Sequence, residues 1–139
     1  MKEEIQSEKG ISYWIMKSEP EVYGINHLDK EKKTIWDGIR NYQARNYMRT
    51  MSIGDLAFFY HSNCKTPGIV GLMKVIENGI VDPTQFDTQS KYYDSKSKRN
   101  NPRWDCVRLE YIKTFQKGIT LERLKQKFSS DELPIVKKG

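Results

Sequence analysis

The stretch that decides the fold is Trp36–Ser62, which reads WDGIRNYQARNYMRTMSIGDLAFFYHS. Asn41 is a favoured helix N-cap, because its side-chain oxygen can accept a free amide hydrogen of the first turn. Apolar residues at helical spacing follow it, and Ser52–Asp55 is a turn signal that ends the helix. Leu56–Tyr60 is apolar at every position, which is typical of a strand covered on both faces. The stretch therefore predicts a turn, a helix, a second turn and a buried strand.

Outward from this stretch, the sequence predicts three more strands. Ile11–Lys17 is the first strand, and Ile69–Ile76 is apolar on both faces. Ile69–Ile76 is expected to form a hairpin with Leu56–Tyr60 across the loop at 61–66. Trp104–Lys113 is a long strand with one apolar and one half-polar face.

Two further helices complete the expected domain. Ile25–Lys33 predicts a short helix, and Thr120 caps a final helix whose inward residues are Leu121, Leu124 and Phe128. Elements in this order describe an α+β domain with a small, curved, mostly antiparallel sheet. A closed or half-closed barrel is the expected way to cover strands that are apolar on both faces.

A long polar segment, Asp82–Arg103, precedes the last predicted strand. Loops of this length are usually functional or disordered. Phe86, Tyr92 and Tyr93 favour an ordered loop, because they can pin it to the body of the domain. The segment is the most basic part of the chain, so we expect it to border any site at the mouth of the barrel.

Charge and composition favour an anionic partner. The 139 residues are expected to form one domain, and the net charge of +6 with 12% aromatic residues favours nucleic acid. Isolated Cys64 and Cys106 predict reduced thiols in an intracellular protein, cytoplasmic in a bacterium or nuclear in a eukaryote. No apolar run is long enough to span a bilayer, so no membrane partner is expected. Residues 1–10 are expected to be a disordered lead, and a monomer is favoured.

Signals for cofactor or nucleophile chemistry are weak. His27 and His61 are the only histidines, and they lack metal-ligand spacing. Gly68–Gly71 lacks the Lys and Ser or Thr of a phosphate-binding loop. Cys64 follows His61 by three residues, which is a weak case for a thiol and its base. The sequence therefore predicts no metal or other cofactor and favours binding over catalysis.

Four motifs resemble those of the EVE domain family. They are YWIMKSEP (Tyr13–Pro20), WDGIRNYQARN (Trp36–Asn46), GDLAFFYHSNC (Gly54–Cys64) and PRW (Pro102–Trp104). The likeness covers roughly Ser12–Leu133, and within the family it is similar to the thymocyte nuclear protein group and its bacterial counterparts. The resemblance implies one PUA-like pseudo-barrel over residues 11–139, flanked by short helices and related to the YTH readers of methylated adenine.

The resemblance also implies a pocket for a modified nucleobase. The leading candidates are 5-methylcytosine and its oxidised forms in DNA. Family members usually extend further past Leu133–Val136, whereas this chain ends at Gly139. We therefore expect either an uncovered barrel edge or a chain shortened at its C-terminus.

The physical needs of base reading match side chains near these motifs. Taking a paired base out of the stack costs a few kcal/mol, and aromatic stacking returns about 1–3 kcal/mol per base. Hydrogen bonds to the base edge give selectivity, and phosphate contacts give salt-dependent affinity. The candidate pocket residues are Lys17, Ser18, Trp36, Asp37, Asn41, Tyr60, His61, Ser62 and Trp104. The candidate phosphate ligands are Arg40, Arg45, Arg49, Lys96, Lys98, Arg99 and Arg103.

Each candidate also has a structural interpretation. Trp36, Tyr60 and Trp104 suit a core, Asn41 suits a helix cap, and His61 suits a satisfied polar neighbour. The basic side chains suit a solvated face. Two other functions stay open, namely an enzyme acting on a nucleotide-like small molecule in the same pocket and a protein-interaction domain. DNA and RNA both remain possible carriers of the base.

Overall fold

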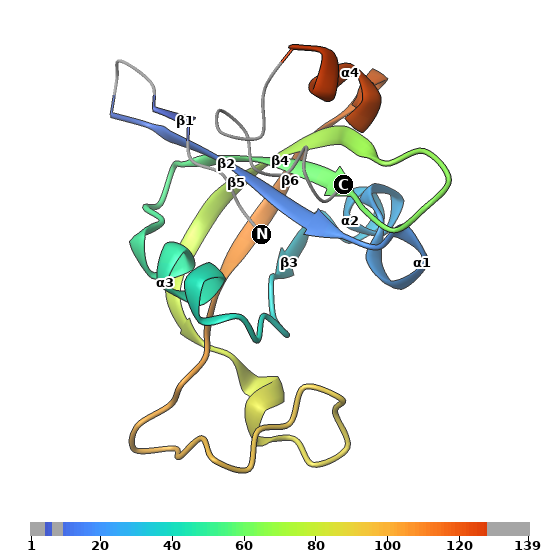
Figure 1. Cartoon of the computed structure of the whole chain (residues 1–139). Helices are drawn as coiled ribbons and strands as arrows, with labels where there is room; N and C mark the ends of the chain where they lie inside the picture. Colours follow the sequence, from blue (N-terminus) through green and yellow to red (C-terminus); the bar gives the residue numbers. More distant parts are fainter. Residues whose placement is uncertain (1–4, 7–9, 128–139) are drawn as a thin grey trace.

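The computed structural model describes residues 5–6 and 10–127, which form an α+β domain (Figure 1). Its strands are β1 (Ile5–Gln6), β2 (Ser12–Ser18), β3 (Lys33–Ile35), β4 (Leu56–His61), β5 (Gly68–Val81) and β6 (Asp105–Thr120). Its helices are α1 (Pro20–Tyr23), α2 (Ile25–Glu31), α3 (Tyr42–Thr50) and α4 (Leu121–Lys127), with a 3₁₀ helix at Pro83–Phe86. Most of the expected lead at 1–10, together with Phe128 and the segment from it to Gly139, lies outside the described residues.

The described strands form one sheet in the order β1-β2-β4-β5-β6-β3. The pair β2–β4 is parallel and the other pairs are antiparallel, which confirms the predicted α+β class with a mostly antiparallel sheet. Register shifts interrupt the pairing of β5 with β6, and such irregularities let a strand bend. Figure 1 shows these two long strands curving through the domain. No pairing among the described residues joins β1 to β3, so the sheet is not closed into a barrel.

Strand β4 is buried on both faces, as its apolar sequence predicts. Phe59 belongs to the main hydrophobic cluster with Trp14, Trp36 and Met73, whereas its neighbour Tyr60 belongs to a smaller cluster. Adjacent side chains enter different clusters because successive residues of a strand point to opposite faces. Leu121 and Leu124 of α4 cover the smaller cluster, and the Thr120 hydroxyl accepts the Arg123 amide hydrogen at the start of this helix.

The predicted cap and turn around α3 are confirmed. The Asn41 side-chain oxygen accepts the backbone N–H of Ala44 at 2.9 Å. After the helix, the Asp55 carboxylate accepts the backbone N–H of Ser52 at 2.9 Å and the indole N–H of Trp14 at 3.0 Å. Because this buried carboxylate binds both the turn and a side chain of β2, it fixes the turn between α3 and β4 against strand β2.

The expected helix over Ile25–Lys33 is too long at its C-terminal end. Helix α2 stops at Glu31, and Lys32 has a positive φ of 72°. Lys33–Ile35 then pairs antiparallel with β6 as strand β3. The free edge of β6 therefore decides the conformation of a segment whose own sequence reads as the end of a helix.

The long loop between β5 and β6 is anchored by the fully buried carboxylate of Asp82. This carboxylate forms an ion pair with Arg40 at 3.0 Å and accepts the backbone N–H groups of Gly38 and Thr84, each at 2.8 Å. Burial alone would raise the pKa of Asp82, but the hydrogen bonds from Thr84, Gly38 and Arg40 outweigh it and lower the pKa. Arg40 also donates to the carbonyl oxygen of Tyr92 at 2.9 and 2.7 Å. One carboxylate thus fixes both the segment before α3 and the loop.

We predict that Asp82→Asn lowers the free energy of unfolding by about 3 kcal/mol at pH 7, because it leaves the Arg40 guanidinium partly buried without a counter-charge. The folded-state pKa of Asp82 is depressed, so the ionised carboxylate stabilises the fold above the unfolded-state pKa, about 3.9. That contribution is lost as the pH falls through the folded-state pKa. The deficit of the variant should therefore shrink below about pH 4.

Urea denaturation at a series of pH values measures this difference. Asp29→Asn is the matched control, because the Asp29 side chain is 48% exposed and pairs with Lys32, the exposed residue that follows α2. The control is expected to stay within about 0.5 kcal/mol of the parent chain. A deficit for Asp82→Asn that is no larger than that of the control would contradict the anchoring role.

Candidate binding site

A cavity of about 530 Å³ lies where β2 ends, a size that is typical of small-ligand pockets. Its walls come from segments far apart in the sequence, and Figure 1 shows β2 ending beside α1 and α2. The lining residues are Lys17, Ser18, Glu19, Val22, Tyr23, Glu31, Thr34, Ile35, Trp36, Asp37, Gly38, Ile39, Ser62, Lys91 and Tyr92. The cavity therefore combines three aromatic rings with hydroxyl, carboxylate and ammonium groups.

Trp36 and Tyr23 supply aromatic surface on neighbouring walls. Trp36 is 7% exposed, and its indole packs edge-on against Phe59, with ring centroids 5.4 Å apart. The Tyr23 ring lies nearly parallel to that of Phe59 at 6.4 Å, so Phe59 supports both residues from the core. The Tyr23 hydroxyl donates to Glu31 at 2.5 Å, and burial together with this bond raises the pKa of Tyr23 to about 12. Tyr23 is therefore an uncharged phenol at neutral pH.

Ser18 and Ser62 hold the ends of the two parallel strands together at the cavity. The backbone N–H of Ser62 donates to the carbonyl oxygen of Ser18 at 3.0 Å. The Ser18 hydroxyl donates to the carbonyl oxygen of Tyr23 at 2.6 Å, which leaves the hydroxyl oxygen as an acceptor. These bonds extend the β2–β4 pairing and fix the turn into α1.

Asp37 is the carboxylate in the segment between β3 and α3. The residue as a whole is exposed, yet the protein around its carboxylate removes enough water to raise the pKa of Asp37. The negative charge of Asp82 raises this pKa further. Asp37 is therefore a hydrogen-bond acceptor that gains a proton at a higher pH than an ordinary aspartate does.

The opposite wall depends on close contact between Gly38 and Tyr92. Gly38 has φ of +79°, and a Cβ atom at this position would lie 2.7 Å from the Tyr92 ring. Glycine is needed here both for the backbone conformation and for the space that the ring occupies. Because Arg40 binds the Tyr92 carbonyl oxygen, both the ring and the backbone of this loop residue are held at the cavity.

The structure brings together part of the predicted pocket set. Lys17, Ser18, Trp36, Asp37 and Ser62 line the cavity. The residues of that set that do not line it are Asn41, Tyr60, His61 and Trp104. Tyr23 and Tyr92 also line the cavity but are not in the predicted pocket set. Tyr23 follows the first motif by three positions, and Tyr92 is one of the predicted anchors of the long loop.

The four residues outside the cavity have structural contacts. Asn41 caps α3, and Tyr60 is fully buried in the smaller cluster. The Nε2 atom of His61 accepts the backbone N–H of Ile25 at 3.1 Å, and burial lowers the pKa of His61. The imidazole is therefore neutral and its acceptor nitrogen is already used. Trp104 is buried, and its indole N–H donates to Asp94 at 2.7 Å.

The predicted phosphate ligands differ in how many of their N–H groups already have acceptors within the protein. All five guanidinium N–H groups of Arg40 have acceptors within the protein, so the structure gives Arg40 an anchoring role instead. Arg45 donates to the carbonyl oxygen of Arg103 at 2.9 Å, and Arg49 pairs with Asp105. Arg103 lies 3.9 Å from the carboxylate of Asp94. On the loop, Lys96, Lys98 and Arg99 are exposed.

Two negative findings apply to residues 5–6 and 10–127. No group of three or more His, Cys, Asp and Glu side chains there is placed to hold a metal ion. In the same part of the chain, every helix is too short or too polar for a bilayer crossing. The two cysteines are free, and burial raises the pKa of Cys106 to about 12.

Comparisons with known proteins agree with the motifs. The sequence matches the model of the EVE domain over residues 12–139. It is 46% identical over 125 residues to thymocyte nuclear protein 1 of Homo sapiens, an alignment that covers 82% of this chain and 56% of the relative. The chain thus spans about half the length of the curated relatives it matches.

Solved structures show the same fold. A protein from Pseudomonas putida has a TM-score of 0.86 at 45% identity, covering 91% of this chain and 85% of the other. The human THYN1 protein in complex with DNA containing 5-methylcytosine has a TM-score of 0.80 at 41% identity, covering 91% and 81%. Motifs, fold and relatives agree with the predicted resemblance: the chain belongs to the EVE domain family.

Proposed function

We propose that this chain is a nucleic-acid-binding module that takes a modified nucleobase, with 5-methylcytosine in DNA as the first candidate, into the cavity beside Trp36. The observation that carries the proposal is the likeness to the human THYN1 protein, whose structure contains DNA with 5-methylcytosine. The cavity of about 530 Å³ supports it, because one flat heterocycle fits within this volume. The net charge of +6 favours the approach of nucleic acid.

The chemistry of the lining suits a methylated cytosine. A base can stack on the ring of Tyr23 or Tyr92, and the small exposed part of Trp36 gives a further contact at the wall. Ile35 and Ile39 offer apolar contact for a methyl group at position 5, as apolar side chains do for the methyl group of thymine. The Asp37 carboxylate can accept a hydrogen bond from the exocyclic amino group of cytosine. Thymine cannot make this bond, because it has a carbonyl oxygen in place of the amino group.

We predict that the parent chain prefers a strand with one 5-methylcytosine over the same strand with cytosine or thymine at that position. Asp37→Ala should reduce the preference for 5-methylcytosine over thymine by about fivefold or more, because a good base-edge contact is worth about 1–3 kcal/mol. Its preference for 5-methylcytosine over cytosine should be retained, since both bases carry the amino group. Fluorescence anisotropy with the three labelled strands measures both ratios, and mass spectrometry of the strands afterwards detects any turnover.

Asp29→Ala is the control, since the Asp29 side chain is half exposed and does not line the cavity. The raised pKa of Asp37 adds a pH test: the preference over thymine should weaken as the pH falls, beginning above the pH at which an ordinary aspartate is protonated. Equal affinity of the parent chain for all three strands would contradict the proposed function. If the ratio of affinities for the 5-methylcytosine and thymine strands is unchanged in Asp37→Ala, only the proposed role of Asp37 is contradicted.

We predict that Gly38→Ala weakens binding of the 5-methylcytosine strand, because the added Cβ displaces the Tyr92 ring from the cavity wall. Gly54→Ala is a matched control: Gly54 also has a positive φ, +100°, but an added Cβ there meets nothing within 4 Å. Both variants should lose about 1–3 kcal/mol of stability from backbone strain. Only Gly38→Ala should lose affinity, as measured by anisotropy at a temperature where both are folded. Equal losses of affinity would show that Tyr92 does not form part of the site.

A further inference from the structure

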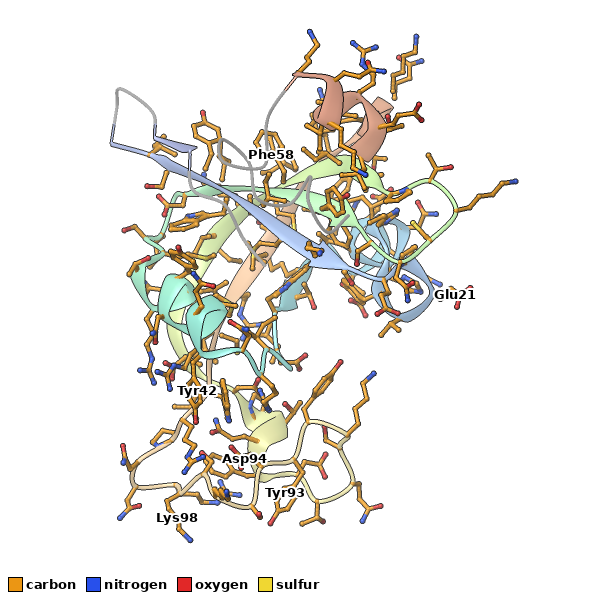
Figure 2. All side chains as sticks on the ribbon, in the orientation of Figure 1. Glu21, Tyr42, Phe58, Tyr93, Asp94 and Lys98 are labelled. Carbon is orange, nitrogen blue, oxygen red and sulfur yellow. The ribbon has the colours of Figure 1, made fainter. Side chains whose placement is uncertain are left out.

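A second aromatic surface lies outside the cavity, at the start of α3. The Tyr42 ring stacks on Trp104, with centroids 4.8 Å apart and ring planes 21° from parallel. Trp104 is 4% exposed and is fixed by its hydrogen bond to Asp94, whereas Tyr42 is 50% exposed. Figure 2 shows Tyr42 between α3 and the long loop that carries Asp94 and Lys98. Tyr42 is therefore an exposed ring on a rigid, buried support.

Trp104 and Arg45 leave the outer face of Tyr42 uncovered, and half of the residue's surface is exposed. The Arg45 guanidinium carbon lies 4.7 Å from the Tyr42 centroid and 5.8 Å from the Trp104 centroid. These distances are similar to the spacing of the two rings, so Arg45 lies beside the stacked pair. A cation covering the outer face of Tyr42 would lie much further from Trp104. The Tyr42 ring is thus backed by Trp104, Arg45 lies over the ring but not opposite Trp104, and half of the residue's surface is exposed to solvent.

The surroundings are basic, and they connect this surface to the cavity. Arg103 reaches the Tyr42 hydroxyl at 3.5 Å, and the loop below carries exposed lysines. The Arg40 guanidinium lies 5.2 Å from the Trp104 ring and 5.7 Å from the ring of Tyr92, which lines the cavity. The contacts that lead from Tyr42 through Trp104 and Arg40 to Tyr92 have lengths of 4.8, 5.2 and 5.7 Å. Their sum is the largest distance that can separate the two tyrosine rings. A strand that rises about 3.4 Å per nucleotide covers that distance in about five nucleotides.

We propose that the outer face of Tyr42 is a stacking platform for a second, unpaired base of the nucleic acid whose modified base enters the cavity; this extends the proposed function. The occupant is a nucleobase because the surface is one flat ring bordered by arginine, the combination that single-stranded nucleic acids use. A protein partner would need a broader apolar patch. Among the described residues, the other large exposed apolar residues are Val22, Ile53, Val81, Tyr93, Ile112 and Ile119, and none of them belongs to α3.

The test compares the parent chain with Tyr42→Ala and Tyr42→Phe, using labelled 12-nucleotide single strands with and without 5-methylcytosine. Loss of one stacking contact should weaken the binding of Tyr42→Ala to both strands equally, by about 5- to 150-fold. Tyr42→Phe keeps the ring and should bind like the parent chain. The dependence of affinity on salt should keep its slope in Tyr42→Ala, because no cation is removed. Lys98→Ala is the contrasting variant, whose slope should fall if Lys98 contacts a phosphate.

Abasic strands identify the contact itself. Replacing each base in turn, other than the methylated one, by an abasic site should reveal one position whose loss weakens the parent chain as much as Tyr42→Ala does. That position should have no further effect in Tyr42→Ala, because the two changes remove the same contact. Unchanged affinity of Tyr42→Ala for both strands overturns the platform, as does additive loss at every abasic position or a loss confined to the methylated strand. Failure of the proposed function is a separate result, namely no preference of the parent chain for methylation.

Discussion

The ion pair between the buried Asp82 carboxylate and the partly buried Arg40 guanidinium is the interaction on which the candidate site depends. The two residues are 42 positions apart, and neither belongs to a strand of the sheet. Buried ion pairs add little net stability compared with apolar packing, but they are costly to break. In this protein the ion pair fixes the positions of two chain segments. One carboxylate orients the backbone at Gly38, one guanidinium holds the Tyr92 carbonyl oxygen, and the cavity wall forms where these two segments meet.

The same guanidinium lies between the two surfaces that we propose for nucleic acid. Arg40 contacts the Tyr92 ring on the side of the cavity and the Trp104 ring behind Tyr42. The sheet provides the rigid frame, since Phe59 of β4 supports Trp36 and Tyr23 from the core. A pocket and a platform that share one set of fixed rings would hold a strand in a single register. Selectivity would then come from both the polar and the apolar groups of the cavity, and much of the affinity from stacking and charge.

Local rules predicted much of the fold and only part of the site. The Asn41 cap and the burial of β4 depend on residues that are neighbours in the sequence, so both could be predicted. Strand β3 could not, because its three residues pair with the edge of β6 and carry no pattern of their own. Arg40 read as a phosphate ligand because its acceptors at Asp82 and Tyr92 are distant in sequence. Trp36 was placed at the cavity by its motif, whereas Trp104 lies behind Tyr42.

Entry of the base into the cavity can be observed through the methyl group of the bound base. An oligonucleotide with a ¹³C-labelled 5-methylcytosine methyl group reports its surroundings by NMR when the chain is added. If the base enters the cavity, the aromatic rings shift the methyl signal upfield, and nuclear Overhauser contacts to Ile35 or Ile39 appear. A methyl signal that keeps its free position, while binding perturbs only basic residues of the long loop, would show that the base does not enter the cavity.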